Sequence, residues 1–128
     1  MDWRERDKNQ RVVITGMGAI TPMGLNVDQY WNSLVSGTSG IDFVTTFDAS
    51  EYPCVVAGEI TDFDPKNYID GKQARRMSRF TQLAVAATQE AIRQSEITIE
   101  NEDKEGIGVI LGNGIGGYPD TEEQVRVL

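Results

Sequence analysis

The sequence predicts an α/β fold, in which a sheet with parallel strands lies between helices, and two stretches support this prediction. Residues 11–15 (RVVIT) form a short apolar run that leads into a loop rich in glycine at residues 16–24 and then into an amphipathic segment. Residues 107–111 (IGVIL) form a second apolar run, which carries no charge and leads into a glycine loop at residues 112–117 (GNGIGG). Short apolar runs bounded by turn residues are typical of strands that are buried on both faces.

A helix is expected to follow the first strand and to begin after Asn26, which can act as its N-cap with Gln29 in the capping-box position. Its apolar residues recur at the spacing of one helical face. They are Val27, Tyr30, Trp31, Leu34 and Val35. Gly37 is a natural C-terminal end for this helix. The order of strand, glycine loop and amphipathic helix is an α/β opening.

The middle of the chain contains weaker signals. Residues 38–53 are expected to form a loop with one short strand at most, and residues 55–60 to form a second strand. Asp64 followed by Pro65 is a favourable helix start, although the Asp70-Gly71 pair should interrupt that helix early.

The longest helical region is expected at residues 72–95, either as one bent helix or as two abutting helices with Ser78 as the second cap. Small and aromatic residues form a stripe along it, namely Phe80, Ala84, Ala87 and Ala91. A surface loop should follow at residues 97–104, and a further helix should begin near Pro119.

Length and composition limit the classes of protein to consider. The 128 residues suit one domain at residues 11–128, preceded by a flexible arm at residues 1–10. No apolar run approaches the roughly 20 residues of a membrane span. A net charge of -8 argues against general nucleic-acid binding. The single cysteine fits a reducing cytoplasm.

The absence of histidine constrains the chemistry most strongly. Without an imidazole, neither a Ser-His nor a Cys-His nucleophile pair can form inside this chain. A zinc site is not expected either, since the chain has one cysteine and no histidine. Cys54 lies beside Pro53 with no basic residue near it in sequence, so it is predicted to be a buried, inert thiol.

The glycine loop at residues 112–117 has two interpretations. It can line a site, because glycine allows positive φ angles and the close approach of another group, or it can be a tight structural turn. It also matches the pattern G-x-G-x-x-G of dinucleotide sites. That match is weak, because Tyr118, Pro119 and Asp120 would delay the helix that should start at once.

Four positive charges cluster at Lys72, Arg75, Arg76 and Arg79, with no acid among them. In a helix these residues would share one face, where like charges repel by roughly 0.2–0.5 kcal/mol per pair. In so acidic a chain, the cluster is interpreted as a docking surface for an anionic partner. The alternative is a solvated helix face.

Together these motifs resemble the N-terminal part of a β-ketoacyl-acyl-carrier-protein synthase, the elongating condensing enzyme of fatty-acid synthesis. The resemblance runs through residues 11–24, 37–41, 75–80 and 112–117, with Trp31, Phe47-Asp48 and Ala57-Gly58 between them. Polyketide ketosynthases share much of this pattern. Ile115 in the glycine loop favours the stand-alone fatty-acid type.

The resemblance implies a thiolase-like fold, in which two similar α/β halves each hold a mixed sheet flanked by helices. This chain would hold an incomplete N-terminal portion of it, and the full-length enzyme would be a homodimer. No metal or nucleotide cofactor is implied, since the phosphopantetheine arrives on the carrier protein. The implied partners are the acyl carrier protein and its acyl and malonyl thioesters.

Matched position by position, Lys72, Arg75 and Arg76 correspond to the family's carrier-docking residues, and Ile115 corresponds to its acyl-pocket position. The catalytic cysteine and histidines of the family match nothing in this chain, so we expect it to be inactive by itself. Two other hypotheses stay open. One is a non-catalytic split or partner subunit of a condensing enzyme, and the other is a dinucleotide-binding module that uses the glycine loop.

Overall fold

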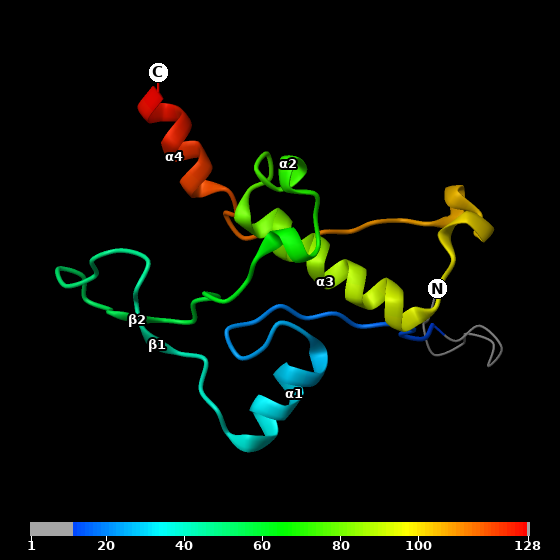
Figure 1. The fold of residues 1–128 in the computed structure, drawn as a ribbon, viewed down its shortest axis with the longest axis horizontal. Helices are drawn as coiled ribbons and strands as arrows, with labels where there is room; N and C mark the ends of the chain where they lie inside the picture. Colours follow the sequence, from blue (N-terminus) through cyan, green and yellow to red (C-terminus); the bar gives the residue numbers. More distant parts are fainter. Residues whose placement is uncertain (1–11, 128) are drawn as a thin grey trace, which may run out of the picture.

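The computed structural model describes residues 12–127, so the predicted arm at residues 1–10 lies outside the described part. The helices and strands in order are α1 (Val27–Ser36), β1 (Asp42–Phe43), β2 (Val56–Ala57), η2 (Pro65–Asn67), α2 (Gly71–Ala74), α3 (Arg79–Ser95), η3 (Ile99–Asn101), η4 (Lys104–Gly106) and α4 (Tyr118–Val127). The longest of them, α3, lies in the middle of the arrangement (Figure 1). None of the described helices combines the length and the apolar character needed to cross a membrane.

The capping residues of α1 confirm most of the prediction made for it. The side chain of Asn26 accepts a hydrogen bond from the Gln29 backbone N–H at 2.8 Å, and Gly37 ends the helix in a left-handed conformation. The predicted capping box is wrong in one detail, because the Gln29 side chain accepts from the backbone N–H of Leu25 at 2.8 Å. Asn26 therefore caps the helix while Gln29 holds the residue that precedes the cap.

The predicted helical region at residues 72–95 is two helices. The first, α2, begins after Asp70, whose side chain accepts from the backbone N–H groups of Lys72 and Gln73. The second, α3, begins after Ser78, although the Ser78 side chain makes no capping hydrogen bond. The turn between them contains Arg75 and Arg76.

The small-residue stripe on α3 allows the first glycine loop to approach closely. A Cβ atom at Gly16 would lie 3.0 Å from the carbonyl carbon of Ala91, and one at Gly18 would lie 2.7 Å from that of Ala87. Only glycine fits at these distances. The segment that contains Gly16 and Gly18 runs beside α3 in Figure 1, where it is blue.

The predicted buried strands at residues 11–15 and 107–111 are wrong for the described residues. Residues 12–15 and 107–111 have no strand assignment, and the sheet of residues 12–127 is an antiparallel pair that joins Asp42 to Ala57 and Phe43 to Val56. Val12 is 84% exposed and Ile110 is 99% exposed. A strand needs a neighbour for its backbone hydrogen bonds, and neither segment finds one in the described part.

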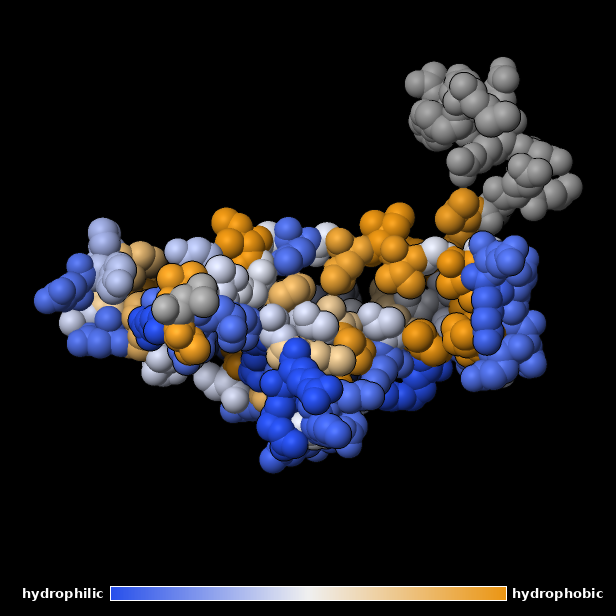
Figure 2. Space-filling view, turned by 90° about the horizontal axis from the view of Figure 1, so that it is seen from above, coloured by the Kyte–Doolittle hydropathy of each residue, from blue (hydrophilic) through white to orange (hydrophobic). Residues whose placement is uncertain are grey.

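The solvent-accessible surface area also shows that many residues are not buried. The chain exposes 11019 Å² for a mass of 14.2 kDa, whereas a self-contained folded monomer of this mass exposes about 6,800 Å². Apolar residues reach the surface in several patches on the face that Figure 2 shows. The buried apolar residues are few, namely Ala49, Phe63, Ile69, Ala74 and Ala86. The described residues thus form a mixed helix and strand arrangement with large uncovered apolar areas.

Candidate functional site

The basic segment, which we define as residues 71–77, presents three exposed cations. Lys72 lies in α2, and Arg75 and Arg76 lie in the turn that follows it. None of the three forms an ion pair with any other residue in the range 12–127, where Arg126 and Glu122 do pair at 2.8 Å. The three charges are therefore available to a partner.

The expectation that Arg79 shares a helical face with these three cations is wrong, because the helix breaks before it. The Arg79 guanidinium donates to the carbonyl oxygens of Ile60 at 2.9 Å and Phe63 at 3.2 Å. It also lies 4.8 Å from the centre of the Phe63 ring, at the distance of a cation–π contact. Arg79 thus holds the preceding chain segment against α3.

Two glutamines on α3, which the sequence pattern did not single out, hold the chain in the same way. The Gln82 side-chain amide donates to the carbonyl oxygens of Ala74 at 2.8 Å and Met77 at 3.2 Å. The Gln89 amide donates to the carbonyl oxygen of Tyr68 at 2.9 Å. Gln82 and Gln89 lie on the same helical face as the fully buried Ala86. Their helical spacing is the sequence signal from which this role could have been predicted.

The glycine loop lies at the N-terminal end of α3. A Cβ atom at Gly116 would lie 2.6 Å from the Phe80 ring, and the Gly116 backbone N–H donates to the side chain of Asn113 at 2.9 Å. Ile115 has a φ of 54° and is 82% exposed. A positive φ is uncommon for a β-branched residue, so the surrounding contacts hold Ile115 in a strained conformation.

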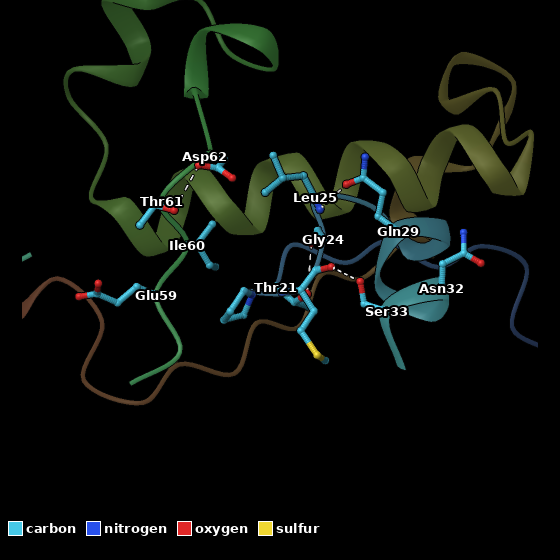
Figure 3. Close-up of a pocket in the computed structure, with 12 residues that line it drawn as sticks. Thr21, Gly24, Leu25, Gln29, Asn32, Ser33, Glu59, Ile60, Thr61 and Asp62 are labelled. Atoms are coloured by element: carbon cyan, nitrogen blue, oxygen red, sulfur yellow. Dashed lines mark hydrogen bonds between the residues drawn. The ribbon is translucent and has the colours of Figure 1, made fainter. Parts of the chain in front are cut away.

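One cavity lies in another part of the described structure. Its volume is about 570 Å³, and its lining comes from the loop at residues 21–25, from α1 and from residues 59–62 (Figure 3). No residue of the glycine loop or of the basic segment lines it. The wall includes Glu59, which accepts hydrogen bonds from the hydroxyl and backbone N–H groups of Thr45 and Thr46. Hydrogen bonds from Thr46 and Thr45 lower the pKa of Glu59 to about 2.

A comparison with protein families decides where this architecture belongs. The sequence model described as "Beta-ketoacyl synthase, N-terminal domain" matches residues 9–127. The chain belongs to the β-ketoacyl synthase family. The resemblance carried by the opening motif and the glycine loop is therefore confirmed.

Curated relatives in this family include enzymes named 3-oxoacyl-(acyl-carrier-protein) synthase 2. The one from Synechocystis is 44% identical over 121 residues, which is 94% of this chain and 29% of the relative. One from Staphylococcus aureus is 44% identical over 115 residues, which is 90% of this chain and 28% of the relative. The chain thus spans less than a third of the length of the curated β-ketoacyl synthases that it matches.

Solved structures of ketosynthases resemble the chain as well. The ishigamide ketosynthase/chain length factor superposes with a TM-score of 0.62 at 34% identity, over 70% of this chain and 22% of that one. A type II polyketide ketosynthase, solved in complex with its acyl-carrier protein, superposes with a TM-score of 0.70 at 24% identity. This superposition covers 89% of the present chain and 29% of the polyketide ketosynthase chain. The second likeness shows the fold alone.

The single cysteine of this β-ketoacyl synthase chain does not have the burial that the sequence predicted. Cys54 is exposed instead of buried, because it lies in the loop before the two-residue strand β2. Its Sγ donates to the carbonyl oxygen of Val56 at 3.4 Å. Among residues 12–127, no group of three or more histidine, cysteine, aspartate or glutamate side chains is arranged to hold a metal ion.

Proposed function

We propose that this chain supplies the N-terminal part of a β-ketoacyl-acyl-carrier-protein synthase of fatty-acid synthesis. Such an enzyme joins acyl and malonyl thioesters by a decarboxylative Claisen condensation. The curated relatives named 3-oxoacyl-(acyl-carrier-protein) synthase 2 support this assignment at 44% identity. The chain contains one cysteine and no histidine, so no Cys-His pair can form within it and it should not catalyse condensation by itself.

The observation that carries the proposal is the basic segment. Lys72, Arg75 and Arg76 are exposed and have no acidic partner among the described residues, although the chain has 20 acidic residues in all. Unpaired cations on an acidic protein attract an acidic partner and speed its association. The partner proposed here is the acyl carrier protein, which brings the phosphopantetheine thioester with it. A ketosynthase with the same fold has been solved with its own acyl-carrier protein bound.

Ile115 is proposed to contribute to the wall of the acyl pocket. Its side chain is 82% exposed and projects from a loop whose conformation Asn113, Gly116 and Phe80 hold. An exposed apolar side chain on a constrained loop can contact an acyl chain once the rest of the pocket surrounds it. A homodimer and a location in the cytoplasm complete the proposal.

The deciding experiment uses a chimera. The chimera is the full-length Synechocystis synthase in which the present chain replaces the matching segment. The two segments are 44% identical. We expect the chimera to condense acyl and radiolabelled malonyl carrier protein, and we expect the 128-residue chain alone to give no product above background. An inactive chimera that is folded and dimeric would contradict the proposal, as would turnover by the chain alone.

The docking surface is tested in the same chimera. Arg75→Glu combined with Arg76→Glu reverses two exposed charges and should weaken carrier-protein association by more than about tenfold at low salt. The loss should shrink as salt screens the charges. The matched control is Arg126→Glu, which reverses a cation in α4. Equal affinity for the double variant and the parent would refute the docking assignment. Binding of a nicotinamide or flavin cofactor by the chimera would favour the dinucleotide module instead.

A further inference from the structure

The turn that presents the two docking arginines is held at both of its ends by one side chain. Arg75 and Arg76 lie between Ala74 and Met77, and the Gln82 amide donates to the carbonyl oxygens of those two flanking residues at 2.8 and 3.2 Å. Both acceptors are carbonyl oxygens, so the NH₂ group of Gln82 must face the turn. Gln82 is half-buried, which shields these bonds from water.

The structure assigns Gln82 the role of a positioning residue for the carrier-docking surface, an inference that rests on the proposed function. Two backbone bonds also close the turn, from the N–H of Arg76 to Gln73 at 2.9 Å and from the N–H of Met77 to Ala74 at 3.1 Å. These bonds tie the turn to α2 but not to α3. Gln82 supplies the tie to α3, because its own backbone belongs to that helix.

The hydrogen bonds of Gln82 favour binding because they order the backbone of the turn in advance. Arginine side chains already lose freedom when they pair with a carboxylate, and a mobile backbone beneath them would add to that cost. Fixing both ends of the turn orders this backbone before the partner arrives. Removing the tie leaves the number of charges unchanged, so the rate of electrostatic encounter should stay the same while the complex dissociates faster.

Gln89 provides a matched control. It is the same residue type on the same face of α3, and it donates to the carbonyl oxygen of Tyr68 at 2.9 Å, outside the basic segment. Gln82→Met and Gln89→Met remove the amide donors and keep an unbranched side chain of similar length. If Gln82 only stabilises the fold, Gln82→Met should lower the free energy of unfolding without changing the rate at which the folded chimera releases the carrier protein.

The test measures association of malonyl carrier protein from Synechocystis with the chimera and its variants by biolayer interferometry over a range of salt concentrations. Gln82→Met should raise the dissociation rate constant about three- to tenfold, the effect expected for loss of one or two hydrogen bonds. The slope of log affinity against log salt should not change, since all three cations remain. In the condensation assay, KM for the carrier-bound substrate should rise while kcat is retained. Gln89→Met should change each quantity by less than about twofold.

The outcomes separate this inference from the proposed function. Parent-like dissociation of the Gln82→Met chimera would overturn the inference, and so would equal weakening by Gln82→Met and Gln89→Met. If Arg75→Glu with Arg76→Glu also leaves binding unchanged, the docking assignment itself has failed. If that double variant weakens binding while Gln82→Met does not, the docking assignment stands and the role of Gln82 is refuted.

Discussion

Replacing Gly18 by alanine should loosen the contact between the first glycine loop and α3. A Cβ atom at this position would overlap the carbonyl oxygen of Ala87, and it would lie 2.7 Å from the carbonyl carbon of that residue and 3.1 Å from the backbone nitrogen of Ala91. All three atoms belong to the backbone of a 17-residue helix, which cannot give way locally. The loop must therefore move away from the helix.

Movement of the loop weakens two hydrogen bonds that its backbone makes to α3. The N–H of Met17 donates to Gln94 at 2.6 Å, and the N–H of Ala19 donates to Glu90 at 3.0 Å. Overpacking of a close contact typically costs about 1–3 kcal/mol. If that cost appears as easier local opening, the two amide protons should exchange about 5- to 150-fold faster.

Native-state hydrogen exchange on the chimera measures this effect at the amides of Met17 and Ala19. The control is Gly71→Ala, because a Cβ atom at Gly71 meets nothing within 4 Å. That substitution should leave both amides unchanged. Exchange in Gly18→Ala that stays within twofold of the parent would show that the loop does not pack against the helix backbone.

Three further predictions concern other parts of the chain. The carboxyl of Glu59 should titrate near pH 2 by carbon NMR, and Thr46→Val should move its pKa toward the ordinary value of 4.5. Since the folded-state pKa is lowered, the stabilising contribution of Glu59 is present above about pH 4.5 and is lost as the pH falls toward 2. An unshifted titration would contradict the hydrogen bonds to Thr45 and Thr46. Ile115→Gly should relieve about 1 kcal/mol of left-handed strain, so that the Gly116 amide exchanges about fivefold more slowly. An unchanged exchange rate would indicate that φ at position 115 is negative in solution. Asn26→Ala should cost α1 about 1 kcal/mol, seen as about fivefold faster exchange of the Gln29 amide, and an unchanged rate would argue against the cap.

The helices could be predicted from the sequence because their signals are local. Asn26 and Gly37 mark the two ends of α1 by their own side-chain and backbone chemistry, which needs no distant partner. Asp70 caps α2 in the same way, although the sequence predicted for it only an interruption of the preceding helix. The choice between one bent helix and two helices needed the structure, since Ser78 occupies the cap position without making a capping bond.

The strand expected at residues 55–60 is present as the two-residue β2, but the two predicted buried strands are absent from the described residues, because pairing is a long-range property. Residues 107–111 have the composition of a buried strand, yet Val109 and Ile110 are among the most exposed apolar residues in the described part. Composition predicts only that such a segment should be covered. The short pair β1 and β2 forms instead because residues 42–43 and 56–57 lie near each other in sequence, so that closing the loop between them costs little.

For the candidate site, the sequence located the charges but not their separate roles. A helical wheel treats Arg76 and Arg79 as equivalent, whereas the helix break turns Arg79 toward the carbonyl oxygens of Ile60 and Phe63. Charge spacing alone cannot reveal this, because the difference arises from the backbone acceptors that α3 meets. The contribution of Gln82 was missed for the same reason.

Different faces of α3 connect the features that the proposal uses. On one face, Ala87 and Ala91 receive the first glycine loop, and Phe80 contacts the second glycine loop, which carries Ile115. On another face, Gln82 holds the basic segment. These contacts join the backbone and side chains of one helix to segments that cross it, so they do not depend on completion of the sheet. The docking surface and the Ile115 loop therefore share one rigid support, and a change that shifts α3 should disturb both, whereas a change confined to residues 107–111 should leave the basic segment in place.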